Sequence, residues 1–215
     1  MTTKFSYVAV ALIIIASLAA ACYVYPLLPE KVASHWNIAG EVDGYMGKFW
    51  GVFLLPIISA LFAGLFFVLP KIDPLRKNID GFRREYNLFF VSVVLFLVYM
   101  YILTLIWNLG VLFEMGRFVT FGIGFLFILM GYILPRTKRN WFLGIRTPWS
   151  LSSDTVWQKT HAVGGRLFIA TGIATVISSL AFPEQSLFVI VGFAVVSVLW
   201  SFVYSYLTYR KEAHT

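Results

Sequence analysis

Six long runs of the chain contain no aspartate, glutamate, lysine or arginine, and they constrain the fold more than any other feature. The runs are Phe5–Tyr25, Trp50–Leu69, Tyr86–Leu109, Phe118–Leu134, Leu167–Phe182 and Gln185–Tyr209. A helix rises ~1.5 Å per residue, so about 20 apolar residues cross the ~30 Å hydrocarbon core of a bilayer. Unpaired backbone amides are costly in lipid, so these runs are expected to be helical. The chain is therefore predicted to be an all-α integral membrane protein with six transmembrane helices.

The composition agrees with this class. Of the 215 residues, 60% are hydrophobic and 13% are charged, whereas a soluble domain carries about 25% charged residues. The spans leave no room for a separate soluble domain, so one membrane domain is expected. Within it we distinguish a two-span unit at 1–70 with an outer loop at 26–49, and a four-span unit at 71–215 with an inner loop at 135–166.

The basic residues are distributed unevenly between alternate loops. If the N-terminus is cytoplasmic, all but three of the 17 lysines and arginines fall in cytoplasmic segments. The three exceptions are Lys31, Lys48 and Arg117. This asymmetry follows the positive-inside rule, so both termini are predicted to be cytoplasmic. The net charge of +7 is then explained by topology and by contacts with membrane lipids, and direct binding of nucleic acid is not expected.

Cys22 is the single cysteine, so the chain cannot form an internal disulfide or a cysteine-based metal site. The apolar run that ends in Ala19-Ala20-Ala21-Cys22 resembles a signal peptide with a lipoprotein-type cysteine. Leu18 lies one residue too far back for that motif. An uncleaved first span is therefore the favoured interpretation, with cleavage at Cys22 as the alternative.

The inner loop is rich in residues that a simple connection does not need. Ser153 and Asp154 predict a helix N-cap followed by a short helix, on which Trp157 and His161 share a face. Upstream, Asn140, Gly144 and the sequence Arg146-Thr147-Pro148-Trp149 indicate an irregular segment with a rigid kink. Two interpretations remain open: a docking platform or re-entrant plug, and an amphipathic hairpin that lies at the lipid headgroups.

The outer loop carries turn signals and a few titratable residues. Asn37…Gly40 and Asp43-Gly44 both favour turns. His35, Glu41 and Asp43 are candidates for part of a cation site, but a solvated loop is the favoured interpretation. The chain has no His-Glu-x-x-His helix and no Cys/His cluster, so neither a metal nor a cofactor is expected.

The six charge-free runs also lack histidine, so tyrosine and Cys22 are their only ionisable side chains. Ion-coupled transporters and channels for charged substrates usually place such groups within the bilayer. Intramembrane proteases likewise need a serine–histidine pair, paired aspartates or zinc ligands at depth. These function classes are therefore not favoured.

Both loops resemble a known family. Residues 140–161 read NWFLGIRTPWSLSSDTVWQKTH, with Leu134-Pro135 before them and Gly164-Gly165 after them, and this pattern is similar to the signature of the SdpI family. The outer loop, with Leu28-Pro29-Glu30, His35-Trp36 and Asp43-Gly44, resembles the small domain of unknown function that often precedes it. One departure is Tyr132, where the family usually has asparagine after the glycine.

The resemblance implies a multi-pass protein of a prokaryotic plasma membrane that protects its host from a secreted, membrane-active peptide toxin. In the founding branch it also implies signalling, in which the protein holds a small repressor at the membrane. Toxin or partner binding is then expected at residues of the two loops. These are Pro29, His35, Trp36, Gly40, Asp43, Asn140, Gly144, Arg146, Thr147, Pro148, Trp149, Trp157 and His161.

Two other functions compete with immunity. A transporter or flippase-like exporter of a peptide or lipid would need no charged residues along a neutral path. A lipid-headgroup enzyme would use Arg146 to hold a phosphate and His161 as acid or base, but His161 has no obvious carboxylate partner. The sequence therefore favours a protein that is not an enzyme.

Overall fold

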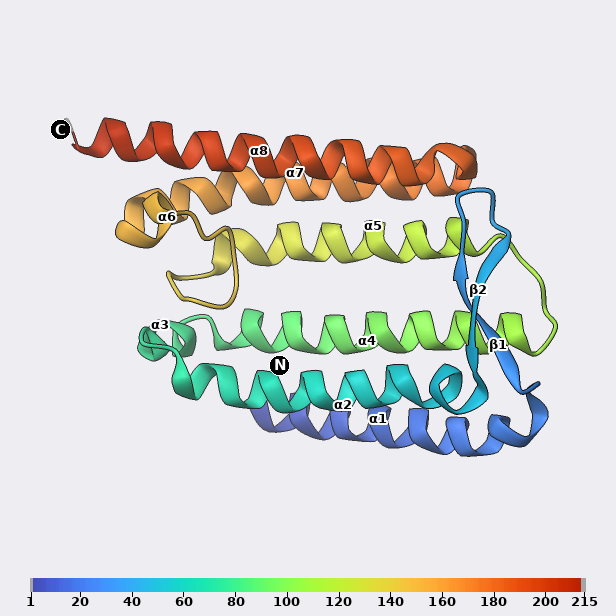
Figure 1. Cartoon of the computed structure of the whole chain (residues 1–215). Coiled ribbons are helices and arrows are strands. Elements are labelled where there is room, and N and C mark those ends of the chain that lie inside the picture. The colour runs from blue at the N-terminus through green and yellow to red at the C-terminus, as the bar shows by residue number, and fades with distance from the viewer. Residues whose placement is uncertain (1, 214–215) are drawn as a thin grey trace.

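The computed structural model describes residues 2–213 and places six long helices side by side (Figure 1). The helices are α1 (Thr3–Val24), α2 (Lys48–Ile72), α4 (Arg83–Asn108), α5 (Met115–Ile133), α7 (Asp154–Ala181) and α8 (Ser186–Ala213). Each is long and apolar enough to cross a bilayer. The predicted all-α fold with six membrane-spanning helices is confirmed for the described residues.

Shorter elements gather at the two ends of the bundle (Figure 1). One end, called the α6 end below, carries α3 (Arg76–Asp80), the 3-10 turn η2 (Leu134–Arg136) and α6 (Pro148–Ser152). The opposite end, called the hairpin end, carries η1 (Tyr25–Leu27), β1 (Lys31–Trp36), β2 (Val42–Gly47) and η3 (Pro183–Gln185). The two loops that the sequence marks as informative therefore lie at opposite ends of the molecule.

Both ends of the described chain lie at the α6 end. Arg83 Nε, at the start of α4, donates a 3.3 Å hydrogen bond to Thr3 Oγ1 near the N-terminus. Near the other terminus, Glu212 accepts a 2.7 Å hydrogen bond from Ser153 Oγ at the start of α7. The positive-inside prediction makes this the cytoplasmic end, and that assignment stays a prediction.

The helices pack in two groups of three, α1 with α2 and α4, and α5 with α7 and α8 (Figure 1). Aromatic side chains hold the first group together. Phe66 on α2 stacks on Phe90 of α4 with ring centroids 5.0 Å apart, and Tyr86 donates a 2.9 Å hydrogen bond to the Phe66 carbonyl. Helix α4 therefore packs with the first two spans, α1 and α2. The sequence division at residue 70 remains untested as a domain boundary.

In the second group, α5 and α7 approach each other through glycines. A Cβ added at Gly172 would lie 2.4 Å from the Gly124 carbonyl oxygen, and one added at Gly131 would lie 2.5 Å from the Gly165 carbonyl oxygen. Small residues are typical of such contacts, since lipid offers apolar side chains little reason to associate and close backbone packing supplies the attraction. This contact fixes α7, which carries two candidate site residues.

Helix α7 differs from the short helix that the sequence predicts ahead of the span Leu167–Phe182. The structure has one continuous helix of 28 residues, about 42 Å long. Ser153 caps it as predicted, because its Oγ accepts a hydrogen bond from the Val156 amide at 3.3 Å. Gly164 and Gly165 lie within this helix without interrupting it, and both are buried against neighbouring segments.

The outer loop forms an antiparallel hairpin that the sequence analysis does not predict. The expected turn at Asn37–Gly40 is confirmed: the Gly40 amide donates a 2.9 Å hydrogen bond to the Asn37 carbonyl, and Gly40 has φ +79°. The turn expected at Asp43-Gly44 is wrong, because both residues lie within β2. Gly44 pairs with His35, and a Cβ at Gly44 would lie only 2.9 Å from His35 Cβ. The glycine there serves close strand approach.

Candidate functional site

Asn140 organises the inner loop at the α6 end. Its side chain is fully buried, and Oδ1 accepts hydrogen bonds from the amides of Phe142 at 2.9 Å and Leu143 at 2.7 Å. Its Nδ2 group donates to the carbonyls of Lys138 at 2.8 Å and Leu143 at 2.9 Å. Asparagine can make these bonds in both directions with one planar group. Asn140 therefore satisfies the irregular backbone around it.

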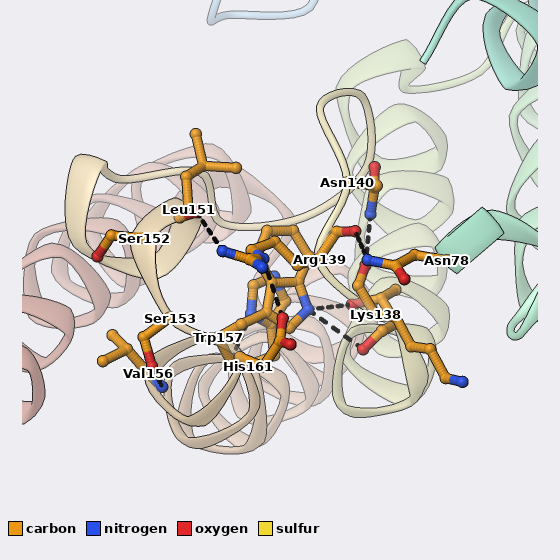
Figure 2. Close-up of polar contacts among 12 residues, drawn as sticks. Asn78, Lys138, Arg139, Asn140, Leu151, Ser152, Ser153, Val156, Trp157 and His161 are labelled. Atoms are coloured by element: carbon orange, nitrogen blue, oxygen red, sulfur yellow. Dashed lines mark hydrogen bonds and ion pairs between the residues drawn. The ribbon is translucent and has the colours of Figure 1, made fainter. Parts of the chain in front are cut away.

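Trp157 and His161 share one face of α7, as their spacing predicts, and their rings stack with centroids 3.9 Å apart. His161 Nε2 accepts a hydrogen bond from the Ile145 amide at 2.9 Å, so the ring is neutral with its proton on Nδ1. Nδ1–H then donates to the Trp157 carbonyl, with 2.7 Å between Nδ1 and the carbonyl oxygen. Trp157 Nε1 in turn donates to the Thr137 carbonyl at 3.2 Å (Figure 2).

The position of His161 excludes it as the general base of a lipid-headgroup enzyme. His161 has 0% exposure, and both of its ring nitrogens are occupied by backbone groups. A general base must reach the proton that it abstracts. His161 therefore acts as a structural residue that links α7 to the inner loop.

Gly144 allows the loop to close over this histidine. Its φ of +128° is unfavourable for residues with a Cβ. An added Cβ would also lie 2.4 Å from His161 Nε2 and 3.0 Å from the Trp157 ring. Backbone conformation and space therefore both require glycine at this position.

The next segment, α6, is held to α8. Thr147 and Ser150 form a capping box around Pro148, which occupies the first position of the helix. Thr147 Oγ1 also donates a 2.9 Å hydrogen bond to Ser205 on α8. Trp149 packs edge-on and tilted against aromatic side chains of α8. The Thr-Pro-Trp part of the signature therefore fastens the loop to the last helix.

Other signature residues remain on the surface. Arg146 is exposed and donates a hydrogen bond to the carbonyl of Trp141, whose own side chain is 48% exposed. Lys138, which precedes them in the same loop, is also exposed. We call Lys138, Trp141 and Arg146 the inner surface. An amphipathic hairpin resting on lipid would not bury Asn140 and His161, so the loop is instead a folded cap on the α6 end.

The hairpin at the opposite end is clamped by α4. Asn108 Oδ1 accepts a 2.8 Å hydrogen bond from the Ala33 amide, and Asn108 Nδ2 donates a 3.0 Å hydrogen bond to the Ala33 carbonyl. Next to this contact, Trp36 packs edge-on against Trp107 with ring centroids 5.3 Å apart. Asn108 thus makes the two backbone hydrogen bonds with Ala33 that a neighbouring strand would make at the edge of β1.

We expect Asn108→Leu to release this clamp. The Ala33 amide and carbonyl would lose their partners, a cost of about 1–3 kcal/mol if they stay buried. Hydrogen exchange at residues 31–47 should become faster while exchange in the α2 and α4 cores stays unchanged. Thr104→Val is a matched control, because the Thr104 hydroxyl donates its hydrogen bond to the Met100 carbonyl of its own helix and not to the hairpin. Unchanged exchange in Asn108→Leu would show that the clamp is not needed.

A cavity of about 920 Å³ lies beneath the hairpin tip. The hairpin crosses the end of the bundle from α2 towards α8 (Figure 1), and the cavity lies between it and both helix groups. Its walls include Leu97 and Met100 on α4, Val119 on α5 and Leu187 on α8. Ligand pockets usually span ~300–1,000 Å³ with mostly apolar walls. The cavity therefore has the size and lining of a ligand site.

Three predicted outer-loop residues, His35, Trp36 and Asp43, line this cavity. His35 Nδ1 lies 2.5 Å from Asp43 Oδ1. Pro29 and Gly40 are not part of the lining, so the cavity brings together three of the five outer-loop residues that the sequence predicts. The remaining walls come from other residues of the hairpin and from α2, α4, α5, η3 and α8. Sequence reasoning missed these helix residues, because nothing in the local pattern marks which apolar positions face a cavity.

Among residues 2–213, no group of three or more His, Cys, Asp or Glu is arranged to hold a metal ion. The fold and its two ends thus define a small multi-pass membrane protein with a folded cap at one end and a ligand-sized cavity at the other.

The comparisons with known proteins agree with both loop motifs. Residues 136–205 match the SdpI/YfhL protein family, and residues 12–60 match a domain of unknown function, DUF1648. The chain is 23% identical to the immunity protein SdpI of Bacillus subtilis (strain 168) over 190 residues, which cover 87% of each chain. No solved structure matches. The predicted resemblance to the SdpI family is therefore confirmed, and the six apolar helices fit a bacterial plasma membrane.

Proposed function

We propose that this protein protects its host cell from a membrane-active peptide and performs no turnover. The likeness to an immunity protein along 87% of both chains supports the proposal. The observation that carries it is the ligand-sized cavity under the hairpin, at the end predicted to face outward. A peptide that attacks the membrane from outside meets that end first.

Survival of a sensitive bacterium exposed to a panel of membrane-active peptides tests this function. Cells that express the wild type should survive at least one peptide that kills control cells. Protection should be lost with His35→Ala or Asp43→Ala, whose side chains line the cavity. Glu30→Ala is a matched control, because Glu30 lies on the same loop, is 93% exposed and is not part of the lining.

Two outcomes would contradict the proposal. Absence of protection against every peptide would remove the immunity function. Peptide or lipid movement across proteoliposomes that contain the purified protein would favour the transporter or flippase alternative instead.

We further propose that the inner surface binds a cytoplasmic repressor. This surface exposes a tryptophan and, nearby in the sequence, two basic side chains, and aromatic and arginine residues are enriched at protein interfaces. Arg146→Ala should leave survival unchanged while it abolishes the transcriptional response to the peptide, measured by RNA sequencing before and after exposure. An unchanged response in Arg146→Ala would count against this signalling role.

A further inference from the structure

The cavity beneath the hairpin lies between the two helix groups and has a mostly apolar lining. Leu97 and Met100 face it from one group, and Val119 and Leu187 face it from the other. Gly116, at the start of α5, also lines it, and a Cβ at Gly116 would meet no atom within 4 Å. The walls therefore leave open space for apolar side chains of a bound molecule.

The charges that line the cavity are acidic. Asp43 on the hairpin and Glu184 on η3 contribute carboxylates, and no lysine or arginine is part of the lining. His35, the remaining titratable residue there, is paired with Asp43 at 2.5 Å. A cleft of one charge sign with low-dielectric walls concentrates counter-charges. The cavity therefore favours a molecule with an apolar body and a positively charged group.

One polar group in the wall lacks a partner. Trp36 Nε1 is buried, and no hydrogen-bond acceptor lies within reach among the described residues. Buried donors are normally paired, because an unpaired donor loses its hydration without compensation. A backbone carbonyl of a bound peptide is the kind of acceptor that this donor lacks.

We propose that this cavity is the docking site for a cationic amphipathic peptide. The apolar face of the peptide would lie against α4, α5 and α8, and a basic group would contact Asp43 and Glu184. Phospholipid fits less well, because its phosphate would approach two carboxylates. This inference rests on the proposed function and specifies the ligand class and the site.

Binding to the purified protein provides the test. The full chain is placed in phosphatidylcholine nanodiscs, which carry no net charge, and titrated with a fluorescent amphipathic peptide of leucine and lysine. Saturable binding beyond that of empty nanodiscs is expected. The leucine–glutamate counterpart should not bind. Asp43→Asn combined with Glu184→Gln should weaken binding by about tenfold or more.

A variant that fills the cavity tests whether the peptide occupies this space, independently of the acidic charges in its lining. Gly116→Phe should abolish binding, because the ring occupies the open space next to Gly116. Gly192→Phe is the matched control, since a Cβ at Gly192 on α8 also meets nothing within 4 Å and Gly192 is not part of the cavity lining. Equal thermal stability of the two variants would show that the loss is local.

Three results would overturn the inference. These are equal binding of the leucine–glutamate peptide, full binding by Gly116→Phe, and a phospholipid that co-purifies with the wild type but is lost from Gly116→Phe when no peptide binds. Cell survival distinguishes the two proposals. If Gly116→Phe cells remain protected, the immunity function holds and the docking site is wrong. If the peptide binds but no cells are protected, the docking site holds and the immunity function is wrong.

Discussion

Gly172→Leu is expected to separate α5 from α7 and to destabilise the protein by about 3 kcal/mol or more. A Cβ there would lie 2.4 Å from the Gly124 carbonyl oxygen and 2.7 Å from the Ile128 backbone nitrogen. Both are backbone atoms, so no side-chain rotation relieves the overlap and the helices must move apart. The measurement is the thermal unfolding midpoint in detergent, together with the monodisperse fraction on size exclusion.

Gly192→Leu provides the control for this prediction. Gly192 also lies on a membrane-spanning helix, but a Cβ there would meet no atom within 4 Å. Its unfolding midpoint should remain close to that of the wild type. If the two leucine variants unfold at the same temperature, the glycine contact between α5 and α7 does not stabilise the bundle.

His161→Ala is expected to unfasten the inner loop, at a cost of about 2–5 kcal/mol. The substitution removes the acceptor of the Ile145 amide, the donor to the Trp157 carbonyl and the ring that stacks on Trp157. It also leaves a cavity in a fully buried place. Protease cleavage within residues 140–153 should become faster, and the unfolding midpoint should fall.

His35→Ala is the matched control for His161→Ala. The His35 side chain is 70% exposed and pairs with Asp43 at the surface, and exposed pairs contribute ~1 kcal/mol or less. Its unfolding midpoint should therefore change little, and the inner loop should resist protease as in the wild type. An inner loop that stays protected in His161→Ala would contradict the structural role of that histidine.

The inner-loop signature shows which features can be predicted from a local sequence pattern and which cannot. The spacing of Trp157 and His161 correctly places both rings on one face, and Ser153 is the cap that its position predicts. The pattern does not reveal that His161 bonds the Ile145 amide. That bond joins a helix to an irregular segment, and the partner of a buried polar group depends on which backbone the fold brings near it.

The hairpin shows a different limit. The turn at Gly40 follows from local chemistry, whereas the glycine at position 44 serves the close approach of β2 to His35. Turn propensity cannot distinguish these two uses of glycine. The clamp on β1 comes from Asn108, which lies 75 residues away from Ala33 in the sequence. No pattern within the outer loop contains that information.

The sequence by itself determined that the chain crosses a membrane six times as helices, because hydropathy and the need to pair backbone amides act locally on each run. The order of residues in the two loops was also sufficient to indicate the family. Only the tertiary structure decided that the inner loop is a folded cap and that the outer hairpin covers a cavity with acidic charges. Packing decides such features, since the cap and the cavity each join segments that are distant in the chain.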